Sequence, residues 1–142
     1  MTETPIQIAS AVPTDTDWLL KVDIHVPEAW VRRCIELNEY LVARSGTEAA
    51  GFLRSSMLWG VVPFMDLIYV EPLCRRRGVG SALFQGWQRA MRNRGATMLM
   101  TSSMSDEPDP LVWHQRNGFE RCGELTFGGF QLTPEAFFVK SL

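Results

Sequence analysis

Three arginines and two glycines stand in one short segment whose chemistry suits a phosphate group. The segment is Arg75-Arg76-Arg77-Gly78-Val79-Gly80, between an apolar strand-like run and a long amphipathic helical pattern. The start of a helix leaves about four backbone N–H groups without partners and carries partial positive charge. Glycine lets the main chain approach a ligand with no Cβ in the way. With the arginine guanidinium groups, these donors would form a cradle for a diphosphate.

The same residues allow two other interpretations. A basic turn entering a helix can simply be a solvated surface, and an arginine cluster can bind nucleic acid. The chain has 14 Lys and Arg against 16 Asp and Glu. A nucleic-acid-binding domain normally carries a basic excess, so this balance argues against the second interpretation. The segment is also neither a Walker A loop nor the GxGxxG dinucleotide fingerprint.

Asp66 is the one ionisable residue in the apolar run of residues 61–70. A carboxylate on a buried strand is unfavourable unless it is paired, and burial raises its pKa. Such a group is suited to accept a proton or to hold an ammonium group. The alternative is a carboxylate that hydrogen-bonds to neighbouring backbone or faces solvent through a bulge.

The elements that must position these residues follow from apolar periodicity and turn signals. Strands are expected at residues 6–12, 40–43, 49–59, 61–70, 96–101, 119–125 and 137–139. A short helix should carry Trp18 and Leu19, and a second, from Pro27, should bury Ala29, Trp30, Val31, Cys34 and Ile35. A long helix should follow Gly78 and stop at Gly95, with Gln88 on its polar side, and a short one should cover residues 111–117.

Composition limits the class of protein. A chain of 142 residues with 46% hydrophobic residues fits one folded domain, here expected over residues 1–142. No apolar run reaches the ~18–20 residues of a membrane span, and no signal peptide is evident at the start. The three cysteines are odd in number and far apart, which favours reduced thiols in a cytoplasmic protein. Cysteines and histidines share no ligand spacing, so we expect no metal site.

Two motifs in order resemble those of the GNAT superfamily of acyl-CoA-dependent N-acyltransferases. Leu67-Ile68-Tyr69-Val70-Glu71-Pro72, followed by the arginine and glycine turn, resembles motif A of that family. Trp113-His114-Gln115-Arg116-Asn117-Gly118-Phe119 resembles its second signature, and the order of elements is similar over nearly the whole chain. The resemblance implies an α/β (α+β) fold with a mixed, mostly antiparallel sheet. About six to seven strands are expected, with helices on both faces and the fourth and fifth strands splayed apart.

The resemblance also implies acetyl-CoA in the cleft between those two strands. Its diphosphate would contact backbone N–H groups of residues 75–81, and its pantetheine arm would run along residues 68–70. A backbone N–H there would polarise the thioester carbonyl. The implied contacts are Ile68, Tyr69, Val70, Arg75, Arg76, Arg77, Gly78, Val79, Gly80 and Ser81.

Two positions carry the implied acid–base chemistry. Relatives often have an acidic residue near Asp66, which supports a role as base or substrate anchor. His114 stands where the family commonly has a tyrosine that protonates the departing thiolate. Imidazole can donate a proton, although a lone histidine beside Trp113 can equally be a packing residue. This departure from the family pattern puts the usual acid in doubt.

The resemblance places the acceptor between the early helices and the last hairpin. Candidates to line that pocket are Trp30, Trp59, Phe127, Phe130 and Glu135, with simple core packing as the alternative. The implied activity is transfer of an acetyl group from acetyl-CoA to a primary amine of a small molecule, peptide or protein, by direct attack in a ternary complex. A non-catalytic acyl-CoA-binding module is the competing hypothesis. The apolar residues 137–139 could pair with a second copy in a homodimer or close a monomer.

Overall fold

The computed structural model describes residues 4–142. Residues 1–3 lie outside the described part. They belong to the domain expected over 1–142 and to the segment examined for a signal peptide. The described chain forms two compact units. The first holds the described residues up to Ser55 together with Leu67–Ala90, and the second holds Ser56–Asp66 together with Met91–Leu142. Each unit is therefore made of two separate stretches of chain.

All the expected strands and helices are present. The strands are β1 (Ile6–Ser10), β2 (Tyr40–Ser45), β3 (Glu48–Leu58), β4 (Val62–Val70), β5 (Met98–Met104), β6 (Glu120–Leu125) and β7 (Glu135–Ser141). The helices are α1 (Thr16–Val22), α2 (Glu28–Glu36), α3 (Val79–Asn93) and α4 (Pro108–Arg116), with short 3-10 turns η1 (Pro13–Asp15) and η2 (Pro72–Cys74). Helix α4 begins three residues before the predicted start because its first turn tolerates proline.

The strands form one mixed sheet in the order β1-β2-β3-β4-β5-β7-β6. Strands β1 and β2, β2 and β3, β5 and β7, and β6 and β7 pair antiparallel. Strand β4 pairs with β5 in parallel, in the register Phe64 to Met100 and Met65 to Thr101. The predicted mixed, mostly antiparallel sheet is confirmed.

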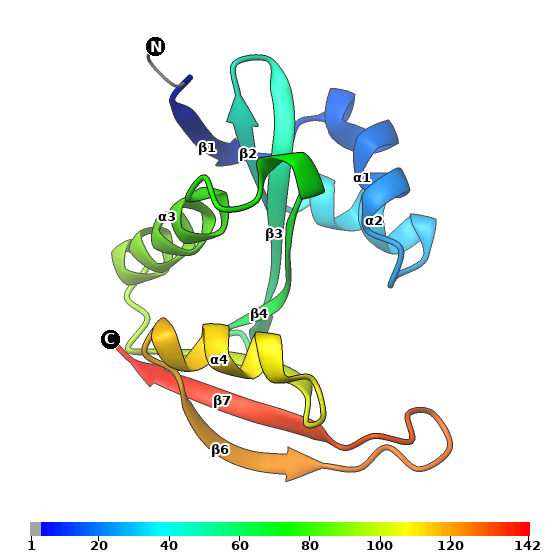
Figure 1. Ribbon diagram of the computed structural model, residues 1–142, viewed down its shortest axis with the longest axis vertical. Helices are drawn as coiled ribbons and strands as arrows, with labels where there is room; N and C mark the ends of the chain where they lie inside the picture. Colours follow the sequence, from blue (N-terminus) through cyan, green and yellow to red (C-terminus); the bar gives the residue numbers. More distant parts are fainter. Residues whose placement is uncertain (1–3) are drawn as a thin grey trace. The chain divides into compact units, whose positions relative to one another are not determined.

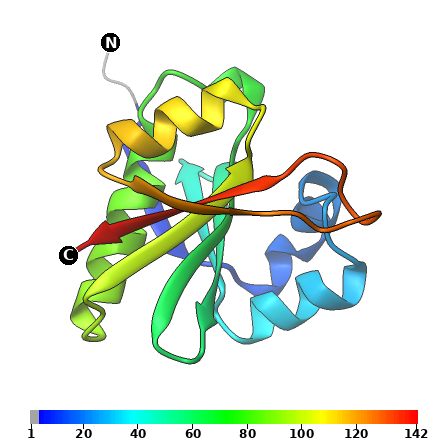
Figure 2. The ribbon, with the colours of Figure 1, turned by 90° about the horizontal axis from the view of Figure 1, so that it is seen from below.

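In the first unit, helices cover both faces of the strands. Figures 1 and 2 show α1 and α2 on one side of β2 and β3, and α3 on the other. On the first side, Leu19, Val31 and Ile35 are buried in one cluster with Val42 and Phe52. On the opposite side, the β1 side chain of Ile8 lies 3.2 Å from the position that a Cβ at Gly86 of α3 would take.

Two details of the expected helical faces are wrong. Ala29 and Trp30 of α2 are exposed, because the buried stripe runs through Val31, Cys34 and Ile35 at helical spacing. Gln88, expected on the polar side of α3, is buried, because it follows Phe84 by four residues on the stripe that also holds Trp87.

The end of α3 follows the prediction. The helix ends at Asn93, and Gly95 adopts φ +90° while its N–H donates to the Arg92 carbonyl at 2.9 Å. Among the helices of residues 4–142, none is long and apolar enough to span a membrane. The three cysteines are free thiols, and within the described chain no three His, Cys, Asp or Glu residues gather as a metal site would need.

Candidate functional site

The start of α3 presents backbone donors that the helix itself does not use. The first hydrogen bond into the helix runs from the Ala82 N–H to the Gly78 carbonyl, at 2.9 Å. The N–H groups of Val79, Gly80 and Ser81 precede this bond, so the geometry of an α-helix gives them no intrahelical acceptor. These three groups are the donors that the sequence predicts at this turn.

The turn that leads to these donors has an unusual backbone. Arg76 adopts φ +64° and Gly78 φ +80°, both in the left-handed region. A non-glycine residue there is strained by about 1–2 kcal/mol. A Cβ built on Gly78 meets no atom within 4 Å, so the space beside it is open. With the side chains of residues 75–77 exposed, the turn combines main-chain donors, positive charge and room for an anion.

Backbone and side-chain bonds hold this turn against the end of β4. The Glu71 N–H donates to the Ala50 carbonyl of β3, and the Cys74 N–H donates to the Glu71 carbonyl, both at 2.8 Å. Arg75 returns toward the strand, where its Nε donates to the Val70 carbonyl at 3.3 Å. The first unit thus brings Val70 and Arg75 together, two of the residues that the resemblance assigns to acetyl-CoA.

Gly51 of β3 is a determinant that sequence reasoning missed. A Cβ at this position would lie 2.4 Å from the Tyr69 carbonyl oxygen and 3.2 Å from Val79 Cγ1. Because backbone cannot yield as a flexible side chain does, β4 and the start of α3 can approach β3 this closely only opposite glycine. An isolated glycine inside a strand pattern was the available signal.

The side chain of Tyr69 is half-buried and packs against the core of the first unit. Its ring stacks on Phe52 with centroids 5.5 Å apart, and its hydroxyl donates to Glu71 Oε2 at 3.1 Å. Burial raises the pKa of Tyr69, and the hydrogen bond to Glu71 raises it further. These contacts hold the side chain of Tyr69, and the contact with acetyl-CoA that the resemblance implies stays a prediction.

Asp66 lies in the second unit, whereas residues 75–81 lie in the first. Its carboxylate is half-buried and accepts a hydrogen bond from the Ser56 hydroxyl of β3 at 3.0 Å.

His114, in the second unit, is 5% exposed and is packed among aromatic rings. Its ring centroid lies 5.1 Å from that of Phe138, 5.7 Å from Trp113 and 5.9 Å from Phe119. Neither ring nitrogen has a hydrogen-bond partner in the described part of the chain, and burial lowers the pKa of His114 to about 4. The imidazole is therefore neutral at pH 7, which favours the packing interpretation; the acid role stays a prediction.

The aromatic candidates for the acceptor pocket are exposed and do not belong to a core. Trp30 is 40% exposed and lies under the Arg33 guanidinium, 4.4 Å from the ring centroid. In the second unit, Trp59 is 85% and Phe130 88% exposed, and Phe127 contacts Phe130 edge-on at 6.2 Å. Glu135 accepts hydrogen bonds from Ser102 and Gln131.

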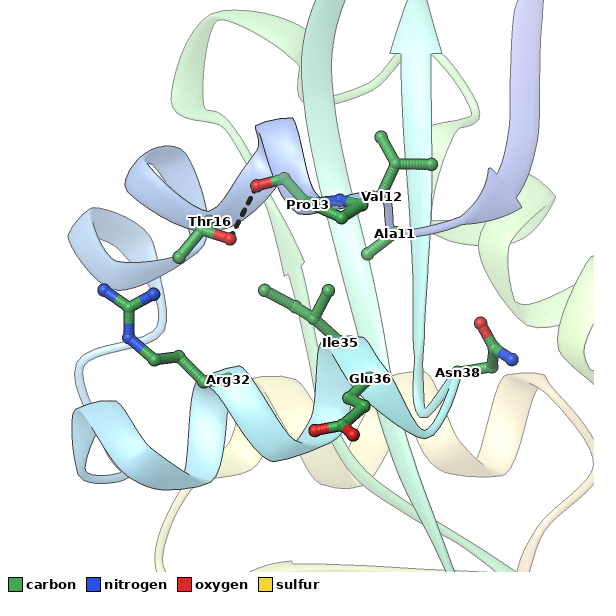
Figure 3. Close-up of a pocket in the computed structure, with 8 residues that line it drawn as sticks. All are labelled: Ala11, Val12, Pro13, Thr16, Arg32, Ile35, Glu36 and Asn38. Carbon is green, nitrogen blue, oxygen red and sulfur yellow. Dashed lines mark hydrogen bonds between the residues drawn. The ribbon is translucent and has the colours of Figure 1, made fainter.

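A groove of about 510 Å³ lies elsewhere in the first unit, between the start of α1 and α2 (Figure 3). Ile35 points from α2 toward the segment before α1, and Arg32 and Glu36 form a polar rim. The lining residues are Ala11, Val12, Pro13, Thr16, Arg32, Ile35, Glu36 and Asn38. None of them is a predicted site residue, and no local motif marks a groove whose walls come from separate segments.

The sequence profile described as the acetyltransferase (GNAT) family matches residues 11–119. The chain belongs to this family. The match includes both the arginine and glycine turn and the His114 segment, so the resemblance seen in the sequence is confirmed. No curated protein matches the chain significantly by sequence.

Solved structures of GNAT proteins are similar over almost the whole chain. Ard1 from Thermoplasma volcanium superimposes with a TM-score of 0.83 at 16% identity, covering 96% of this chain and 97% of that one. The ribosomal-protein-alanine N-acetyltransferase from Brucella melitensis gives 0.80 at 18% identity, covering 96% and 99%. The yncA protein from Salmonella typhimurium, solved with its cofactor acetyl-CoA, gives 0.76 at 16% identity, covering 96% and 94%. At such identities the likeness shows the fold.

Gly78→Ala should weaken coenzyme A binding about tenfold, equivalent to ~1.4 kcal/mol, because its methyl group enters the open space beside the donors. Gly95→Ala is the matched control, since Gly95 is also left-handed and a Cβ there also meets nothing within 4 Å. Both variants should lose similar stability, and Gly95→Ala should keep its affinity. Titration calorimetry measures the binding; equal affinities in the two variants would place the cradle elsewhere.

His114→Phe should change how stability depends on pH. The folded pKa of about 4 lies below the ordinary 6.5, so the unfolded chain binds more protons between these values. The wild-type free energy of unfolding should therefore fall, by up to about 3 kcal/mol, as pH falls from 6.5 to 4.

The phenylalanine variant should lack this component of the slope, as urea titrations at several pH values can measure. A packing role also predicts that the variant keeps its acetyl transfer at pH 7.5. Loss of transfer with intact stability would instead establish His114 as the acid.

Proposed function

We propose that this GNAT protein is an enzyme that transfers an acetyl group from acetyl-CoA to a primary amine, with residues 1–142 acting as one domain. The observation that carries the proposal is the start of α3, where the N–H groups of Val79, Gly80 and Ser81 have no intrahelical acceptor and the space beside Gly78 is open. These donors and three exposed arginines fit a diphosphate. Membership of the family and the acetyl-CoA bound to the yncA protein support the choice of donor.

The thioester of bound acetyl-CoA supplies an activated acetyl group. The cradle would hold the diphosphate, and backbone N–H groups among residues 68–70 would hold the carbonyl oxygen as charge develops on it. Asp66 would accept a proton from the amine, whose nitrogen bonds to the acetyl carbon as the carbon–sulfur bond breaks. The products are an N-substituted acetamide and the thiol of coenzyme A, with one proton from the ammonium form of the substrate released overall.

Positioning would supply most of the rate acceleration. Holding an amine and a thioester in attack geometry replaces a bimolecular encounter with a step inside one complex. The acceptor class remains a primary amine of a small molecule, peptide or protein. Protein amines are included because one structural neighbour is named a ribosomal-protein-alanine N-acetyltransferase. Trp30, Trp59 and Phe130 are the proposed acceptor contacts, since exposed aromatic faces suit an apolar or cationic substrate.

A non-catalytic acyl-CoA-binding module is the second candidate function. The burial of His114 favours it, because a neutral imidazole packed between Phe119 and Phe138 is a poor source of a proton for a departing thiolate. The binding module would use the same cradle as the enzyme but would not turn over acetyl-CoA.

Release of coenzyme A, followed with a thiol reagent across a panel of amines, separates the two candidates. The panel should contain amino acid amides, polyamines, aminoglycosides and peptides with a free N-terminal alanine. Cys122 is exposed and would consume reagent, so the assay should use Cys122→Ser protein. Thiol release with at least one amine supports the enzyme. Thermal stabilisation by acetyl-CoA without release from any amine supports the binding module, and the absence of both rejects the shared cradle.

Asp66→Asn should lower kcat at pH 7 by about 10²-fold, the range that general bases contribute, and leave the Kd for acetyl-CoA unchanged. Asp106→Asn is the control, because the Asp106 carboxylate accepts a hydrogen bond from the Thr133 hydroxyl and is exposed. Steady-state kinetics from pH 6 to 9 measure the effect. Equal activity of Asp66→Asn and wild type across this range would reject the base role.

A further inference from the structure

The carboxylate of Glu71 joins two elements beside the cradle. Its Oε1 accepts a hydrogen bond from Trp18 Nε1 of α1 at 2.9 Å, and its Oε2 accepts one from the Tyr69 hydroxyl of β4 at 3.1 Å. Each oxygen thus has its own donor, and Trp18 lies 53 residues away in the sequence. Hydrogen bonds to a charged group are stronger than those between neutral groups.

Aromatic packing makes this junction rigid. Trp18 meets Phe52 edge-on with ring centroids 6.1 Å apart, and Phe52 stacks on Tyr69 at 5.5 Å. Phe52 is fully buried, so the three rings are anchored in the core of the first unit. Glu71 closes the polar end of this group of rings.

The backbone of the same residue fixes the path of the chain into the turn. The Glu71 N–H is held by Ala50 of β3, and the Glu71 carbonyl receives the Cys74 N–H, which closes the turn η2. The next residue, Arg75, is in turn held by the Val70 carbonyl. A shift of Glu71 would therefore displace residues 72–75, which lead directly to the donors at the start of α3.

Both donors to the Glu71 carboxylate are neutral groups, Trp18 and Tyr69. Glu71 stands four residues before Arg75, yet no ion pair joins its carboxylate to an arginine in the part of the chain that the structure describes. The guanidinium groups of residues 75–77, whose side chains are exposed, can therefore face an anion.

We propose that Glu71 is a positioning residue for the diphosphate of acetyl-CoA, acting through the turn and not on the reacting atoms. The proposal rests on the proposed function and extends it to a residue outside the phosphate contacts. Trp18 is its partner, so helix α1 takes part in cofactor binding without touching the cofactor.

The test compares Glu71→Ala and Glu71→Gln with wild type. The amide of glutamine can accept from Trp18 and donate to the Tyr69 oxygen, whereas alanine loses both contacts. Glu71→Ala should raise the Kd for coenzyme A about tenfold by calorimetry, equivalent to ~1.4 kcal/mol, because the turn that leads to the donors loses both side-chain contacts of Glu71. Glu71→Gln should stay within about twofold of wild type, a difference of under 0.5 kcal/mol.

A second donor separates positioning from general damage to the fold. S-acetylpantetheine lacks the diphosphate, so Glu71→Ala should keep the wild-type kcat/KM with it while the KM for acetyl-CoA rises. Trp18→Phe removes one hydrogen bond and keeps an aromatic ring. It should raise the KM for acetyl-CoA but not that for S-acetylpantetheine. This variant still tests the proposal if Glu71→Ala does not fold. Glu48→Ala, an exposed glutamate at the start of β3, is the neutral control.

Three results would overturn the proposal. Equal coenzyme A affinity in wild type, Glu71→Ala and Trp18→Phe would remove the positioning role. An equal loss with both acyl donors would make Glu71 a purely structural residue. Failure of the wild-type protein to bind coenzyme A would reject both the proposed function and this inference. This result differs from the first two because it is seen in the wild-type protein without any substitution.

Discussion

The contact between β3 and the end of β4 at Gly51 is the constraint on which the candidate site depends. The Tyr69 carbonyl occupies space that any side chain at position 51 would fill, and Val79, the first residue of α3, approaches the same point. This close approach fixes where the strand ends and where the helix begins. The turn between them then has a set span, within which Arg76 and Gly78 adopt positive φ.

The candidate chemistry is divided between main chain and side chains. Binding is assigned to backbone groups, which are preorganised because the helix and strand that carry them are held by hydrogen bonds. Proton transfer is proposed for Asp66, whose carboxylate accepts a hydrogen bond from the Ser56 hydroxyl. The ring of His114 is packed among aromatic groups, and its burial disfavours charge. Burial therefore accounts for the neutral state of His114.

Sequence reasoning succeeded where the determinant is local. Residues close in the sequence determine the donor turn, the apolar stripe of α3 and the end of α3 at Gly95, so spacing alone predicts them. It failed where the determinant is a distant partner. Nothing near Glu71 in the sequence indicates that Trp18 donates to it, and the burial of Gln88 depends on what packs against α3. The exposure of Trp30 likewise depends on which face of α2 meets the strands. The local determinants identify the family, whereas the distant contacts stabilise the position of its candidate site.

The tip of the β3–β4 hairpin holds a residue whose type is unfavourable for its backbone conformation. Trp59 and Gly60 both adopt positive φ, of 54° and 72°, and the Val61 N–H closes the turn onto the Leu58 carbonyl, as in a type I′ turn. Asparagine or glycine usually occupies the first of these positions, whereas here a large ring stands in water and in a disfavoured backbone region. An asparagine at position 59 would relieve both at once without touching the core. If the tryptophan serves binding, that function must outweigh the folding stability that asparagine would restore. The hairpin tip is therefore a position where stability and binding would be in conflict.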